Sequence, residues 1–102
     1  MKMYDIEIMP KALEDLDGIA EYLYGFSPVI AAKYKELIKA QILSLRHMPK
    51  SYALVRVQRL ADLGFRWAYV RNYVIFFTVD EERKVVTVQR ISYSSRDYDA
   101  LL

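Results

Sequence analysis

The chain has 102 residues, no cysteine and a single histidine, a length that suits one domain spanning residues 1–102 with its own core. This composition excludes a disulfide scaffold, a thiolate metal site and a multi-histidine metal site, and no apolar run reaches the roughly 18 residues of a membrane span. Residues 1–45 hold five Lys/Arg against seven Asp/Glu, whereas residues 46–102 hold ten against six. The basic second half therefore suits either a phosphate-bearing partner or an ordinary solvated surface.

The first half of the chain predicts one strand followed by two helices. Residues 3–8 alternate between apolar and polar or charged side chains, as in a strand with one wet face. Apolar residues then recur at helical spacing from Pro10 until Gly25, and again from Pro28 until just before Pro49. The short connection between the two helices favours an antiparallel helical hairpin.

The second half predicts three strands. Residues 48–62 show no dominant period and are expected to form a loop, with a short strand at 53–57. Residues 65–70 alternate, residues 73–79 form an apolar run typical of a buried central strand, and residues 85–91 are rich in β-branched side chains. A short polar segment follows the last strand.

The predicted order is β-α-α-β-β-β, which indicates an α+β domain. In this arrangement the helical hairpin packs on one face of a mostly antiparallel four-stranded sheet. No predicted element covers the other face, so that face and its rim are where a functional site is expected.

The candidate site residues are basic and aromatic, because no glycine-rich phosphate loop, metalloprotease motif or Ser/His/Asp set is present. Arginine binds phosphate well through its planar guanidinium, and five arginines come from the strands or from the loops beside them: Arg56, Arg59, Arg66, Arg90 and Arg96. Tyr93 and Tyr98 flank Arg96 and could stack on a base or move a proton. A purely structural role stays open for each, for example an ion pair of Arg66 with Glu7 or Asp97.

The C-terminal stretch carries a resemblance to a known family. Its most specific parts are the pair Phe65-Arg66, the segment NYVIFFTVDEE at residues 72–82, and the terminal Ser95-Arg96-Asp97. Together with the preceding strand and helical hairpin, they resemble the RelE/ParE superfamily of toxins from type II toxin-antitoxin modules. The similarity covers essentially the whole chain.

The resemblance implies growth inhibition, plasmid stabilization and neutralisation by a cognate antitoxin, but the superfamily has two mechanisms. RelE-like members cleave mRNA on the ribosome without a metal; in that branch Arg66 and Arg96 would be catalytic, with Tyr98 or Tyr93 as weaker candidates. ParE-like members poison DNA gyrase and are not enzymes. Arg59 lies near one lysine position of the nuclease pattern and nothing matches a second, so the ParE-like branch is favoured. A third reading is a non-toxic module that only binds an antitoxin.

The partners implied are an antitoxin and either DNA gyrase or the ribosome with mRNA, and Arg56, Arg59 and Arg90 would contact that target. No cofactor, metal or membrane is expected. The N-terminus lacks the unbroken apolar segment of a signal peptide, so a cytoplasmic protein is expected. An antitoxin peptide is expected at the sheet edge or on the hairpin, where aromatic residues cluster at 22–26. A homodimer is left open.

Overall fold

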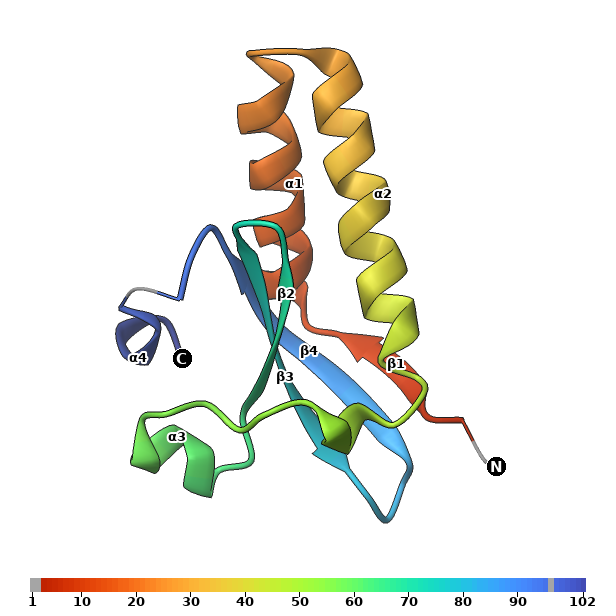
Figure 1. Ribbon diagram of the computed structural model, residues 1–102, viewed down its shortest axis with the longest axis vertical. Helices are drawn as coiled ribbons and strands as arrows, with labels where there is room; N and C mark the ends of the chain where they lie inside the picture. Colours follow the sequence, from red (N-terminus) through yellow and green to blue (C-terminus); the bar gives the residue numbers. More distant parts are fainter. Residues whose placement is uncertain (1–2, 96) are drawn as a thin grey trace.

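The computed structural model describes residues 3–95 and 97–102 (Figure 1). Along the chain the elements are β1 (Asp5–Ile8), α1 (Pro10–Tyr24), α2 (Pro28–Ser44), the single 3-10 turn η1 (Pro49–Ser51), α3 (Gln58–Asp62), β2 (Arg66–Val70), β3 (Tyr73–Asp80), β4 (Val85–Ser92) and α4 (Tyr98–Leu101). The predicted β-α-α-β-β-β order is confirmed, and three short helical elements are added to it. No described helix has the length and the apolar composition that crossing a membrane requires.

The four strands form a single sheet in the order β1-β4-β3-β2. The pairs β2–β3 and β3–β4 are antiparallel and are joined by short turns, whereas β1 lies parallel to β4. A parallel pair needs a long crossover connection, which the helical hairpin and the first two antiparallel strands supply here. The prediction of a mostly antiparallel sheet is therefore confirmed.

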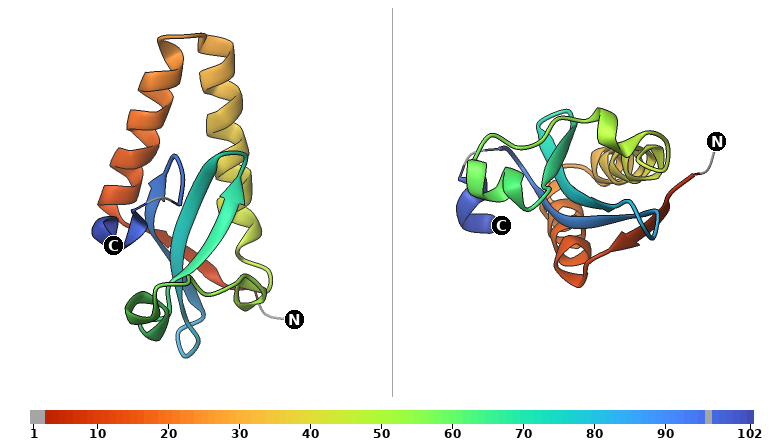
Figure 2. Two further views of the ribbon diagram at one scale, coloured as in Figure 1. Left: turned by 60° about the vertical axis from the view of Figure 1, so that its left-hand side comes forward. Right: turned by 90° about the horizontal axis from the view of Figure 1, so that it is seen from below.

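The helical hairpin begins and ends where the sequence predicts. Pro10 is the first residue of α1, and α2 starts at Pro28 with the Ser27 side chain accepting a hydrogen bond from the Ile30 N–H at 3.3 Å. Such a cap satisfies one of the free N–H groups at a helix start. The closed end of the hairpin extends past the sheet and stands clear of the strands (Figure 2).

The main core lies between the hairpin and one face of the sheet. Residues from both helices pack against alternate residues of the strands, and the buried cluster comprises Ala12, Leu16, Ile38, Ile42, Leu45, Ala68, Val70, Tyr73, Ile75, Phe77, Val86, Val88 and Ile91. Because side chains alternate along a strand, the residues between these point to the opposite face.

The opposite face is also covered, so the prediction of an open face is wrong. A second buried cluster contains Val55, Leu60, Val74, Phe76 and Tyr98, and its cover consists of the 53–57 segment, α3 and α4. The two short helices lie on the same side of the molecule (Figures 1 and 2). Both are too short to produce a helical period in the sequence. The strand expected at 53–57 is reduced to one isolated antiparallel bridge between Leu54 and Arg66.

Candidate functional site

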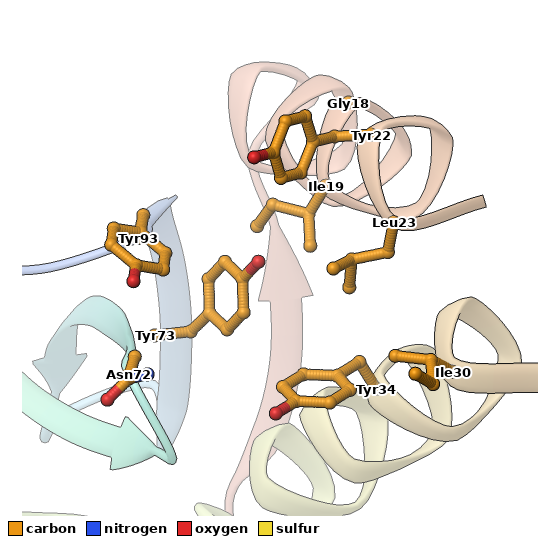
Figure 3. A pocket seen from close by; sticks show the side chains of 9 residues that line it. All are labelled: Gly18, Ile19, Tyr22, Leu23, Ile30, Tyr34, Asn72, Tyr73 and Tyr93. Carbon is orange, nitrogen blue, oxygen red and sulfur yellow. The ribbon is translucent and has the colours of Figure 1, made fainter. Parts of the chain in front are cut away.

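A groove opens between the helical hairpin and the end of the sheet where the β2–β3 turn and the end of β4 lie (Figure 3). Its volume is about 480 Å³, and we call it the tyrosine groove because four of its nine lining residues are tyrosines: Gly18, Ile19, Tyr22, Leu23, Ile30, Tyr34, Asn72, Tyr73 and Tyr93. None of these side chains carries a charge at neutral pH. Concave, mostly apolar surfaces with a few polar groups are typical of binding sites.

Tyr73 forms the centre of the groove. Its ring makes edge-to-face contacts with Tyr34, at a centroid distance of 5.8 Å, and with Tyr93, at 5.5 Å. Burial raises the pKa of the Tyr73 hydroxyl, and the neighbouring tyrosines 34, 93 and 22 raise it further. The hydroxyl is therefore protonated at physiological pH and can donate a hydrogen bond.

The hairpin tip beside the groove exposes large apolar side chains, as the aromatic cluster in the sequence suggested. Tyr22, Tyr24, Phe26 and Val29 are 65%, 63%, 72% and 78% exposed. The rings of Tyr22 and Phe26 contact each other at a centroid distance of 5.2 Å. Adjoining exposed apolar residues of this kind mark an interaction surface.

Arg66 lies on the hairpin face of the sheet, since it pairs with Phe77 of the main core. Its Nη1 donates hydrogen bonds to the backbone carbonyls of Tyr52, at 2.6 Å, and of Lys50, at 3.3 Å. The guanidinium thus fastens the η1 turn to the first residue of β2. The ion pair with Glu7 that the sequence left open is not formed, because Glu7 pairs with Arg83 at 3.6 Å.

Arg90 lies on the other face, where it pairs with Phe76 of the second cluster. Its Nε and Nη2 donate to the two carboxylate oxygens of Asp15 at 2.8 and 2.9 Å, and Asp15 also accepts from the Ile91 N–H at 3.0 Å. The hydrogen bond to Asp15 is the first cause of a raised pKa of Arg90. This pair ties α1 to the end of β4. No sequence pattern predicts this pair, because acidic residues on a helix are usually only solvated.

The remaining predicted residues are dispersed. Arg56 is exposed, and Arg59 donates from Nη2 to the Asp99 carbonyl of α4 at 3.2 Å. Arg96 lies outside the described residues. Tyr93 is 63% exposed on the rim of the tyrosine groove. The structure therefore does not bring Arg66 and Arg90 together, because the two residues lie on opposite faces of the sheet.

Tyr98 is buried in the second cluster. Its ring stacks on Phe76 at a centroid distance of 5.5 Å and meets Trp67 edge-on at 5.3 Å, and its hydroxyl accepts a hydrogen bond from the Val57 N–H at 2.7 Å. These contacts hold α4 against the sheet. Among the described residues, no group of three or more acidic or histidine side chains is placed to hold a metal ion.

Comparison with known proteins identifies a family and several similar solved structures. The family model described as the ParE toxin of the type II toxin-antitoxin system, parDE, matches residues 6–98. The chain is similar to a structure titled chromosomal ParDE TA system from P. aeruginosa, with 23% identity, a TM-score of 0.74, and coverage of 91% of this chain and 98% of the other. It is also similar to a chain of the toxin-antitoxin complex RelBE2 from Mycobacterium tuberculosis, with 19% identity, a TM-score of 0.66, and coverage of 93% and 95%. No curated protein matches the sequence.

Proposed function

This chain belongs to the ParE toxin family and is the toxin of a type II toxin-antitoxin module, and from that premise we propose that its target is DNA gyrase. The observation that carries the choice of target is the placement of the arginines. A ribonuclease without a metal would need several cations around one phosphate. Arg66 and Arg90 instead lie on opposite faces of the sheet, and each donates hydrogen bonds inside the protein. This arrangement favours a toxin that acts by binding.

Arg66 and Arg96 are the proposed catalytic pair of the ribonuclease alternative, and alanine variants of each separate the two mechanisms. For a gyrase poison, Arg66→Ala is expected to leave growth arrest within about threefold of the parent, because the side chain is engaged with backbone carbonyls, and to cost roughly 1–2 kcal/mol of stability. Arg96→Ala is expected to weaken arrest, because it removes a charge available to a phosphate-rich target. Growth after induction and thermal unfolding of the purified variants measure the two effects.

The ribonuclease alternative makes the opposite prediction. A folded Arg66→Ala variant that has lost toxicity, with transcript cleavage in cells that express the parent, would contradict the gyrase proposal. Absence of growth arrest by the parent, with retained antitoxin binding, would instead indicate the non-toxic module. Arg71→Ala, at an exposed arginine outside the predicted target-binding set, controls for the general loss of a positive charge.

We propose that the antitoxin docks on the tyrosine groove and the adjoining hairpin tip. The groove offers an uncharged concave surface, and the tip adds exposed apolar side chains. Covering these side chains with a partner removes apolar surface from water and so stabilises the complex. Co-purification with the product of the neighbouring reading frame tests the partner, and its failure under co-expression would count against the proposal. The cytoplasmic location and the homodimer stay predictions.

A further inference from the structure

The hydroxyl of Tyr73 is an unused hydrogen-bonding group at the floor of the tyrosine groove. The residue is only 4% exposed. Within the described part of the chain no group forms a hydrogen bond with its hydroxyl. Figure 3 shows that the ring stands between Tyr93 and Tyr34 and that the hydroxyl points across the groove toward Ile19 and Tyr22 of α1. Because no buried side-chain oxygen of the described residues lacks a partner, this unpaired oxygen is accessible to water through the groove.

Tyr98 shows how a tyrosine hydroxyl is paired once it is shielded from water. The hydroxyl of Tyr98, which is 9% exposed, takes a hydrogen bond from the Val57 N–H. Buried polar groups in proteins nearly always have a partner, since an unpaired one costs the full penalty of its desolvation. Any partner that fills the groove removes the water from Tyr73 and must replace the lost hydrogen bond.

We propose that Tyr73 is a specificity-determining residue for the antitoxin and donates a hydrogen bond to an acceptor side chain of the bound segment. The inference rests on the proposed antitoxin docking. The matching segment places apolar side chains against Ile19, Leu23 and Ile30, and between them one Asp, Glu, Asn or Gln whose oxygen reaches Tyr73. The raised pKa of the phenol supports this direction, because the group stays a donor. A segment without the acceptor is rejected, because binding it leaves the hydroxyl unpaired.

Tyr73→Phe tests the inference, because it removes only the oxygen. The probe is the purified product of the neighbouring reading frame, and its affinity for the parent and variant toxins is measured by titration calorimetry. We expect the variant to bind about tenfold or more weakly, since the acceptor of the partner is then buried without a donor. Tyr69→Phe is the matched control: it removes the same oxygen from a tyrosine that is 51% exposed and lies outside the groove and the hairpin tip, so a change within about threefold is expected.

The affinity of Tyr73→Phe for the probe also defines the result that would overturn the proposal. If the partner offers no acceptor, the Tyr73 hydroxyl is desolvated at a cost in the parent complex, and Tyr73→Phe then binds equally well or more tightly. Either outcome refutes the inference while leaving the docking intact. A parent protein that does not bind the probe refutes the docking and this inference together. Thermal unfolding of Tyr73→Phe is expected to match the parent, because the hydroxyl has no partner to lose.

A partner-side experiment identifies the acceptor. Each Asp, Glu, Asn and Gln in the bound part of the probe is replaced by alanine and titrated against the parent and against Tyr73→Phe. One replacement is expected to weaken binding to the parent about tenfold and to have little further effect on binding to the variant. Additive losses at every position would contradict a hydrogen bond to Tyr73.

Discussion

Replacement of Asp15 by alanine is expected to lower the free energy of unfolding by about 2–4 kcal/mol, the largest effect of any single acidic residue on this fold. The carboxylate accepts two hydrogen bonds from Arg90 and one from the Ile91 N–H, and the two side chains of the pair are only 16% and 22% exposed. Its removal leaves a guanidinium and a backbone donor without their acceptor. Urea or thermal unfolding measures the loss, which corresponds to a fall in Tm of more than about 10 °C for a domain of this size.

Asp17→Ala is the matched control, since Asp17 lies two residues along the same helix and is exposed. A change within about 0.5 kcal/mol is expected there. A double-mutant cycle of Asp15→Ala with Arg90→Ala should give a coupling energy of about 1–3 kcal/mol. Independent effects in the cycle would contradict the ion pair and return Arg90 to the set of target-binding candidates.

Substitution of Ile30 by glutamate is expected to weaken antitoxin binding about 100-fold or more. Ile30 lines the tyrosine groove and is 44% exposed, so the free protein can hydrate the new carboxylate, whereas a bound partner would bury it without a cation among the groove residues. Leu43→Glu places the same charge on the same helix, at a position that is 59% exposed and lies outside the groove and the hairpin tip.

The comparison of these two variants locates the docking site. Leu43→Glu is expected to change the affinity by no more than about threefold, because the carboxylate stays in water. Equal and large losses for both variants would show that the added charge itself, and not its position in the groove, controls binding. An unchanged affinity of Ile30→Glu would place the antitoxin elsewhere on the toxin. Both variants are expected to keep the fold, which circular dichroism checks.

Most of the fold could be predicted from periodicity and from capping residues. Ser27 and Pro28 mark the start of α2, and the apolar run at residues 73–79 marks the central strand, whose residues 73–77 are buried. The same run also implied burial on both faces, since a strand with one wet face alternates. The cover of the second face was missed because α3 and α4 have five and four residues.

The candidate site could be predicted only in part. Arginines were identified by residue type, but residue type does not show which acceptors lie within reach after folding. Arg66 donates hydrogen bonds to backbone carbonyls of residues 50 and 52, and Arg90 donates to a carboxylate that is 75 positions away in the sequence. The tyrosine groove joins residues from both helices, the β2–β3 turn and the end of β4, and no local pattern connects these segments. Only the exposed aromatic residues of the hairpin tip gave a signal for it.

The proposal that this toxin poisons DNA gyrase is tested most directly by measuring cleavage of plasmid DNA with purified components. The protein is incubated with gyrase, ATP and supercoiled plasmid, and the DNA is analysed after detergent and protease treatment, beside a parallel reaction with translating ribosomes and a defined mRNA. A gyrase poison is expected to produce linear DNA that accumulates with toxin concentration and disappears when the antitoxin is added first, with the mRNA left intact. Intact plasmid together with cleavage of the ribosome-bound mRNA would contradict it.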